Sequence, residues 1–286
     1  MRNTALLAAT AAIALAAPAA AQDHGNMDHA NMDHSAHAEH MAMENALNIE
    51  SILMHPRRAD DRARDQYRRP AETLAFFQID PTMRVAEFGP GGGWYTRVLM
   101  PYLAPQGHYM AFQGAGRPAD DGTTWSQRFL AASQGWGEGG HVMAFETDAV
   151  PEEVTGTVDR VLIFRSLHGL LNSESADTQL RAMHSMLAED GLVGVVQHRA
   201  PEGASYADSN GSRGYLRQSD VIRLFELNGF ELHAQSEVNA NPNDTADWEG
   251  GVWTLPPTLR YGDQDRARYE AIGESDRMTL LFRKRA

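Results

Sequence analysis

An acidic residue followed by three evenly spaced glycines is the motif with the clearest chemical use. Glu87, Gly89, Gly91 and Gly93 lie at the end of an apolar run that begins at Val85. Glycine lets the backbone approach a ligand closely and takes φ values that other residues avoid. A strand that enters such a turn before a helix can place a ligand there, although a tight strand–helix connection without a ligand uses the same residues.

Basic side chains follow two of the expected strands. Arg165 and His168 come after one strand, and His198 and Arg199 come after the next. Ligands of open α/β sheets bind at the carboxyl ends of the strands. Histidine, with an unperturbed pKa near 6.5, can take a proton from a substrate at neutral pH. We therefore take His168, His198 and Arg199 as candidate catalytic residues. The alternative is that each histidine only caps a strand and hydrogen-bonds a loop.

A repeat of metal-binding side chains occupies residues 22–43. An Asp-His pair recurs every five residues, and asparagine and methionine lie between the first pairs. Methionine sulfur selects Cu(I), and imidazole suits Cu(II) or Zn(II). The candidate ligands are His24, Met27, His29, Met32, His34, His37 and His40. The repeat resembles the Met/His/Asp tracts of periplasmic copper-resistance proteins. Because it has almost no apolar content beyond methionine, we expect a disordered tail over 22–45. The alternative is a soluble spacer whose histidines bind nothing specific.

The first 21 residues have the pattern of a cleavable signal peptide. Arg2 precedes the apolar run 5–17, Pro18 breaks that run, and alanines at 19–21 offer a cleavage site. A membrane anchor is the alternative, but the run is shorter than the roughly 20 residues that a spanning helix needs. We therefore expect a periplasmic or secreted protein with no stable membrane insertion after cleavage.

The composition limits the classes of binding partner and of site that this protein can have. The formal net charge of −13 argues against nucleic acid, because an acidic surface repels phosphate backbones. The absence of cysteine excludes disulfides, thiolate metal sites and cysteine nucleophiles. Arginines cluster over 57–69, but three aspartates are interleaved with them, so 46–69 is expected to be a salt-bridged helical arm. A small-molecule substrate remains the most natural partner.

Apolar segments of strand and helix length alternate from about residue 70 to the C-terminus. The expected strands are 84–88, 108–112, 141–145, 158–164, 192–197, 230–236 and 277–282, and the expected helices are 95–103, 124–132, 177–187 and 219–228. A shorter helix is expected at 46–54, and Pro70 can open another at its first turn. This alternation predicts a mainly parallel α/β sheet with helices on both faces, in one domain over 70–286. No secondary structure is assigned to 239–275.

These motifs together resemble class I S-adenosylmethionine (SAM) methyltransferases. The turn Glu87-x-Gly89-x-Gly91-x-Gly93 is similar to the family's acid-x-Gly-x-Gly-x-Gly motif, and the segment 145–149 to its adenine loop. The resemblance implies a three-layer, Rossmann-like sheet of seven strands in the order 3-2-1-4-5-7-6, with the last strand antiparallel. It extends to a bacterial branch of predicted exported methyltransferases, which share segments like 55–70, 251–257 and 272–278.

The same resemblance assigns the cofactor contacts. It implies that Glu87, Gly89, Gly91 and Gly93 face the methionine and ribose parts of SAM and that Asp148 meets the adenine. The family usually ends its second strand in an acid that takes both ribose hydroxyls. Gln113 stands there in this sequence and can accept one hydrogen bond without bringing a charge.

Two functions follow. The first is an exported SAM-dependent methyltransferase that acts on a small molecule and carries a metal-binding tail. The second is an exported, non-catalytic binding protein with the same fold, involved in copper handling. In either case the polar and aromatic segment 239–275 could form a lid or substrate wall, or only satisfy its own backbone. A second metal site formed by Glu274, Asp276 and a histidine is a further possibility that nothing in the spacing demands.

Overall fold

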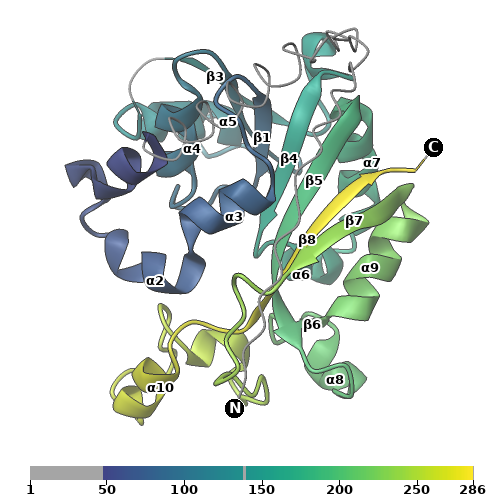
Figure 1. The fold of residues 1–286 in the computed structure, drawn as a ribbon. Helices are drawn as coiled ribbons and strands as arrows, with labels where there is room; N and C mark the ends of the chain where they lie inside the picture. The colour runs from purple at the N-terminus through teal and green to yellow at the C-terminus, as the bar shows by residue number, and fades with distance from the viewer. Residues whose placement is uncertain (1–47, 138–139, 286) are drawn as a thin grey trace, which may run out of the picture. The chain divides into compact units, whose positions relative to one another are not determined.

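The computed structural model describes residues 48–137 and 140–285 (Figure 1). The expected signal peptide and the His/Met-rich repeat, with all seven of its candidate ligands, lie outside the described residues. Within the described ranges, no helix combines the length and the apolar character that crossing a membrane requires.

The centre of the fold is a mostly parallel sheet in the order β3-β2-β1-β4-β5-β8-β7. Strands β1 to β5 pair in parallel, and β8 runs antiparallel between β5 and β7. The strands are β1 (Arg84–Phe88), β2 (His108–Gln113), β3 (His141–Glu146), β4 (Val158–Phe164), β5 (Leu187–Ala200), β6 (Leu216–Arg217), β7 (Phe230–Ser236) and β8 (Arg277–Lys284). The short β6 pairs only with β5, outside this path. Without it, the order is 3-2-1-4-5-7-6, which confirms the predicted fold class.

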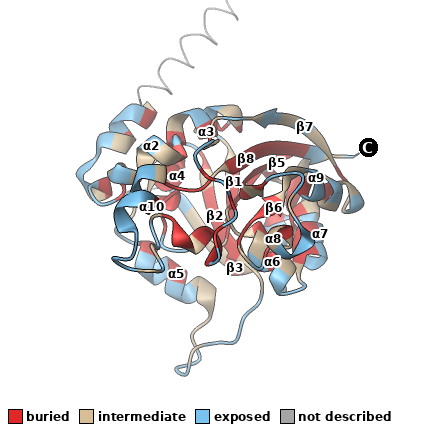
Figure 2. Cartoon of the chain, turned by 90° about the horizontal axis from the view of Figure 1, so that it is seen from below, coloured by how far each residue is buried: buried red, intermediate tan, exposed pale blue. Residues whose placement is uncertain are grey.

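Helices cover both faces of the sheet, as the alternation predicted (Figure 1). One apolar core lies between the sheet and α3 (Pro70–Phe76), α4 (Thr96–Leu103) and α5 (Trp125–Ser133). The other lies between the sheet and α6 (Leu167–Asn172), α7 (Ala176–Met186) and α9 (Gln218–Leu227). Successive residues of a strand pack into different cores: Val85 lies in the first core and Ala86 in the second. Figure 2 shows the resulting buried band along the strands.

Local sequence signals set several of the element boundaries. The first described helix ends at residue 54, directly before His55-Pro56, as expected for a residue that precedes proline. Pro70 occupies the first turn of α3, which confirms that prediction. β5 begins at Leu187, five residues before the predicted start at 192, because Leu187 already pairs with Val158 ahead of an irregular step in the ladder.

The arm that precedes α3 consists of short helical turns held by ion pairs, as predicted. It contains Pro56–Arg58, Arg62–Arg64 and α2 (Asp65–Arg68). Arg58 pairs with Asp65 at 2.8 Å, and Asp61 pairs with Arg97 of α4 at 2.6 Å. The arm is thereby fixed against the strand–helix turn after β1.

The segment 239–275, which the sequence left unassigned, packs around a third small core. It contains η4 (Gly251–Thr254) and α10 (Arg266–Ile272). The remaining short helices are α8 (Tyr206–Ser209) and η3 (Glu152–Val154). In Figure 1, α10 and α8 lie below the lower ends of the strands.

Candidate functional site

A cavity of about 430 Å³ opens where β1, β4 and β5 end, the position at which open α/β sheets bind ligands. This volume is within the range of about 300–1,000 Å³ that is typical of small-molecule sites. Five parts of the chain contribute to its wall: the arm, the glycine turn, the residues that follow β4, the end of β5 and the segment 239–275, called the late segment below. The lining residues used below are Arg64, Arg68, Glu87, Gly91, Gly92, Trp94, Arg165, His168, His198, Trp253 and Glu274.

The glycine turn after β1 has the backbone that only glycine adopts easily. Gly89, Gly91 and Gly93 have φ values of +55°, +57° and +77°. A Cβ added at Gly91 or Gly92 would meet no atom within 4 Å, whereas one at Gly93 would lie 2.1 Å from the ring of Trp136. The turn is therefore open to a ligand at Gly91 and Gly92, and Gly93 is required by packing.

Glu87 is buried beneath this turn, with 2% of its surface exposed. Its Oε2 accepts hydrogen bonds from Tyr109 Oη at 2.6 Å and from Thr96 Oγ1 at 2.8 Å. Burial raises the pKa of Glu87 to about 7, against the lowering effect of these hydrogen bonds and of Arg165. The carboxyl group is thus held by the protein's own hydroxyl groups and is only partly ionised at neutral pH.

His198 is a buried, neutral imidazole on the cavity wall. Its Nδ1 lies 2.6 Å from Ser275 Oγ, and its Nε2 has no hydrogen-bond partner in the described part of the chain. Burial lowers its pKa well below the ordinary value, and the charges of Arg165 and Arg277 lower it further. When Nδ1–H donates to Ser275, the lone pair of Nε2 is available to accept a proton.

His168 lies beside His198, with 5.7 Å between the ring centroids. Gln197 Nε2 donates to the carbonyl of Gly214 at 2.8 Å and is 3.4 Å from His168 Nδ1. A carbonyl only accepts, which identifies this Gln197 atom as the amide nitrogen, and its second hydrogen can face His168 Nδ1. This arrangement favours the tautomer of His168 with its proton on Nε2. His168 therefore suits a donor role and His198 a base role.

Arg199, the third candidate catalytic residue, is not brought to this cavity. Its guanidinium pairs with Glu237 at 2.7 Å and with Asp276 at 2.8 Å. Successive side chains of a strand point to opposite faces, so His198 and Arg199 at the end of β5 cannot both line one cavity. Its two carboxylate partners instead give Arg199 a structural role, in which it ties the end of β5 to the residue after β7 and the residue before β8.

The predicted adenosine contacts are also absent from the cavity wall. Gln113 ends β2 and Asp148 is exposed after β3. The backbone joins the two strand ends, because Thr147 N donates to Gln113 O at 2.9 Å. Gln113 and Asp148 therefore lie at the same edge of the sheet, but neither lines the cavity beside the glycine turn.

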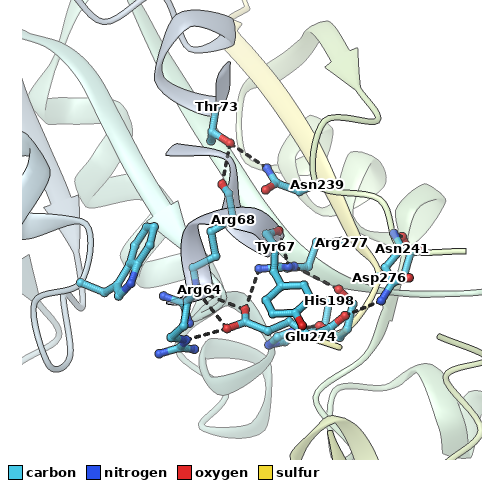
Figure 3. A network of polar contacts seen from close by, with 12 residues as sticks. Arg64, Tyr67, Arg68, Thr73, His198, Asn239, Asn241, Glu274, Asp276 and Arg277 are labelled. Carbon is cyan, nitrogen blue, oxygen red and sulfur yellow. Dashed lines mark hydrogen bonds and ion pairs between the residues drawn. The ribbon is translucent and has the colours of Figure 1, made fainter. Parts of the chain in front are cut away.

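A cluster of arginines around Glu274 is the main feature that sequence reasoning missed (Figure 3). Arg64, Arg68 and Arg277 donate to the Glu274 carboxylate, at 2.6, 3.1 and 3.1 Å. The interleaved charges of the arm signalled ion pairs, but the partner of Arg68 is 206 positions away. No local pattern identifies such a partner.

Two expectations about the late segment can now be assessed. Trp253 and Glu274 line the cavity, so part of the segment forms a wall. Asn241 instead donates to the carbonyls of Ile272 and Glu274, and Asp244 accepts from the backbone of Ala246, as in the alternative. No group of three or more His, Asp or Glu side chains that could hold a metal occurs among residues 48–137 and 140–285.

Comparison with known proteins finds solved methyltransferase structures that are similar to this chain. No protein-family model and no curated protein matches it. A SAM-dependent methyltransferase from Aquifex aeolicus matches with 17% identity over 68% of this chain and 93% of that one, with a TM-score of 0.45. The putative methyltransferase bound to the Trm112 activator of Haloferax volcanii matches with 14% identity over 80% and 94%, with a TM-score of 0.48.

A third solved structure is similar as well. The [4+2]-cyclase SpnF matches with 16% identity over 77% of this chain and 81% of that one, with a TM-score of 0.49. A fold by itself does not determine an activity. The chain is structurally similar to SAM-dependent methyltransferases, and its activity must be argued from its own site.

Proposed function

We propose that this protein is a SAM-dependent methyltransferase that acts on a small molecule. The observation that carries the proposal is the open turn at Gly91 and Gly92, which borders a ligand-sized cavity at the end of β1. The sheet order adds support, since the antiparallel β8 between β5 and β7 is the arrangement that the family resemblance implied.

The residues of the glycine turn fit SAM, whereas those at the ends of β2 and β3 do not. Gly91 and Gly92 leave room for a ligand against the backbone, and the buried Glu87 lies beneath them. Gln113 and Asp148, expected at the ribose and adenine, do not line the cavity. We therefore assign the glycine turn to cofactor binding and propose no contact between SAM and these two residues.

When bound, SAM supplies a methyl group on a positively charged sulfur, which a nucleophile on the acceptor can attack. The protein's task is then to align the acceptor and to remove its proton. His198 Nε2 suits that removal because the imidazole is neutral and Ser275 fixes its other nitrogen. His168, with its proton on Nε2, can donate a hydrogen bond to the acceptor.

The Gly92→Ala variant tests cofactor binding without straining the fold. Gly92 does not have a positive φ, and the added methyl group would project into free space beside the cavity. We expect wild-type stability and at least tenfold weaker binding of SAM and S-adenosylhomocysteine, measured by calorimetry. Gly203→Ala is the matched control, because it too meets no atom but lies outside the cavity. Equal binding by all three proteins would refute the assignment of the turn.

The second candidate is a non-catalytic binding protein with a methyltransferase-like fold. The uncharged Gln113 favours it, because a carboxylate that could accept hydrogen bonds from both ribose hydroxyls is missing at this position. The same calorimetry separates the two functions. If neither SAM nor S-adenosylhomocysteine binds the wild type at millimolar concentration, the binding-protein function replaces the enzyme.

Export and copper binding complete the proposal. The leader pattern of residues 1–21 supports a periplasmic or secreted location, and the repeat of 22–43 supports copper binding. Deleting residues 22–43 should remove most copper uptake and leave the thermal midpoint unchanged. Equal copper stoichiometry in the intact and truncated proteins would contradict a copper-binding tail.

A further inference from the structure

More positive than negative charge surrounds the inner part of the cavity. Arg64, Arg68 and Arg277 share the single carboxylate of Glu274. Arg165 lines the same cavity, and its guanidinium has no hydrogen bond or ion pair with any described residue. Four guanidinium groups are therefore balanced by one carboxylate.

Two of these guanidinium groups have buried N–H donors without an acceptor. Arg68 is 1% exposed, and its Nη1 and Nη2 have no hydrogen-bond partner; Arg64 Nη2 is in the same situation. The planar face of Arg68 rests on Trp94, 4.6 Å from the ring centroid, and its Nε is bonded to Glu274. Desolvated cations with unused donors cost free energy. An anion bound in the cavity would offset that cost.

Arg165 is the member of this group that lines the cavity and has no carboxylate partner among the described residues. It directly follows β4, is half-buried and has a φ of +57°, in the left-handed region that disfavours side chains. Backbone strain of this kind persists where the surroundings impose it, commonly at functional sites. Burial lowers the pKa of Arg165 to about 10, so the group stays charged at neutral pH.

The other acidic groups of the cavity do not neutralise this charge. Asp61 accepts two hydrogen bonds from Arg97, at 2.6 and 2.7 Å, and so compensates that arginine. Glu87 has a pKa of about 7 and is only partly ionised. The excess positive charge therefore remains on Arg165 and on the three arginines that share Glu274.

The same cavity also has an apolar wall. It is formed by the late segment, with Val252, Trp253, Pro256 and Pro257. His168 contributes its ring, 6.0 Å from that of Trp253 and nearly perpendicular to it at 70°. A ligand that suits both parts carries an anion on an apolar or aromatic body.

We propose that the cavity binds an acidic small molecule, whose oxyanion pairs with Arg165 while its apolar body rests against the Trp253 wall. A carboxylate or a phosphate fits, because the guanidinium fork matches the geometry of both. This oxyanion belongs to the methyl acceptor. That assignment rests on the proposed function, whereas the oxyanion site itself rests on the arginines alone.

The test measures binding of benzoate, benzamide and inorganic phosphate to the full-length protein by calorimetry at constant ionic strength. Benzamide is the neutral, nearly isosteric control for benzoate. We expect benzoate to bind at least tenfold more tightly than benzamide, and phosphate to compete with benzoate. Equal binding of benzoate and benzamide, or no binding of either anion, would overturn the proposal.

Arg165→Met is the informative variant, because it orphans no carboxylate. Removing an uncompensated charge should leave the ligand-free thermal midpoint at or above that of the wild type, while benzoate binding weakens at least tenfold. Arg223→Met, at an arginine with 67% of its side chain exposed, should change neither property. Unchanged benzoate binding in Arg165→Met would rule out Arg165 as the contact.

S-adenosylhomocysteine distinguishes the two possible sources of the oxyanion, since it carries a carboxylate of its own. We expect Arg165→Met to bind it as the wild type does. If the variant loses S-adenosylhomocysteine and keeps benzoate, the arginine serves the cofactor and the assignment to the acceptor fails. If benzoate binding depends on Arg165 but no protein binds S-adenosylhomocysteine, the oxyanion site stands and the methyltransferase proposal falls.

Discussion

Arg68 Nε lies 3.1 Å from Glu274 Oε2, and this ion pair joins the N-terminal arm to the residues that lead into β8. Both side chains are buried, with 1% and 4% exposed. Because Arg64 and Arg277 donate to the same carboxylate, Glu274 is the hub between the arm, the cavity and the last strand (Figure 3).

Replacing Glu274 by Gln should therefore destabilise the fold strongly. It leaves three guanidinium groups without a counter-charge, and breaking a buried pair costs about 3–5 kcal/mol. Glu270→Gln is the matched control, because the Arg266–Glu270 pair is about half exposed and such pairs contribute roughly 0.3–0.5 kcal/mol. Urea denaturation measures both. Similar losses for the two variants would contradict the role of Glu274 as the hub.

Glu87 should make stability depend on pH. Its folded pKa of about 7 lies above the ordinary value of 4.5, so the folded state holds a proton that the unfolded chain has released. Stability is thus full below about 4.5 and is lost as the pH rises through 7, by about 3 kcal/mol in total. Glu87→Gln cannot ionise and should escape this loss.

The measurement is the difference in unfolding free energy between Glu87→Gln and the wild type at pH 5 and pH 8. We expect the variant to gain on the wild type by up to about 3 kcal/mol across this range. In Glu237→Gln the difference should stay constant, because hydrogen bonds from Arg199 lower the pKa of Glu237 and keep it ionised throughout. A flat profile for Glu87→Gln would show that Glu87 is ionised in the fold.

His198 should titrate well below the ordinary histidine pKa of about 6.5. Burial comes first among the causes, and Arg165, His168 and Arg277 add to it. The base form would then persist to acidic pH, and the acidic limb of methyl transfer would lie below 6.5. NMR titration of the imidazole, assigned with His198→Asn, measures this without a known acceptor. A midpoint at or above 6.5 would remove the case for His198 as the base.

Arg199→Met should cost stability without affecting binding. The guanidinium donates two hydrogen bonds each to Glu237 and Asp276, and hydrogen bonds to charged groups contribute about 1.5–3 kcal/mol. Since Arg199 does not line the cavity, calorimetry should give wild-type affinities for benzoate and S-adenosylhomocysteine. Arg165→Met should show the opposite pattern, and loss of binding in Arg199→Met would restore Arg199 as a functional residue.

The sequence by itself determined the fold class and predicted the edge of the sheet at which the candidate site lies. Strand and helix segments, the Pro70 helix start and the glycine turn after 84–88 are local patterns, because hydrophobic period and backbone freedom are set by neighbouring residues. The rule that ligands bind at the carboxyl ends of strands then predicted that His168 and His198 lie at the edge of the sheet where the cavity opens.

The tertiary structure decided which of these residues act together. His198 and Arg199 are adjacent in sequence, and only the pairing of β5 with β8 fixed their different surroundings. Glu274 meets Arg68 across 206 positions, and the lack of an ion pair at Arg165 among the described residues is evident only once the partners of the other arginines that line the cavity are known. Charge compensation and burial depend on long-range neighbours, so local spacing could not predict the oxyanion site.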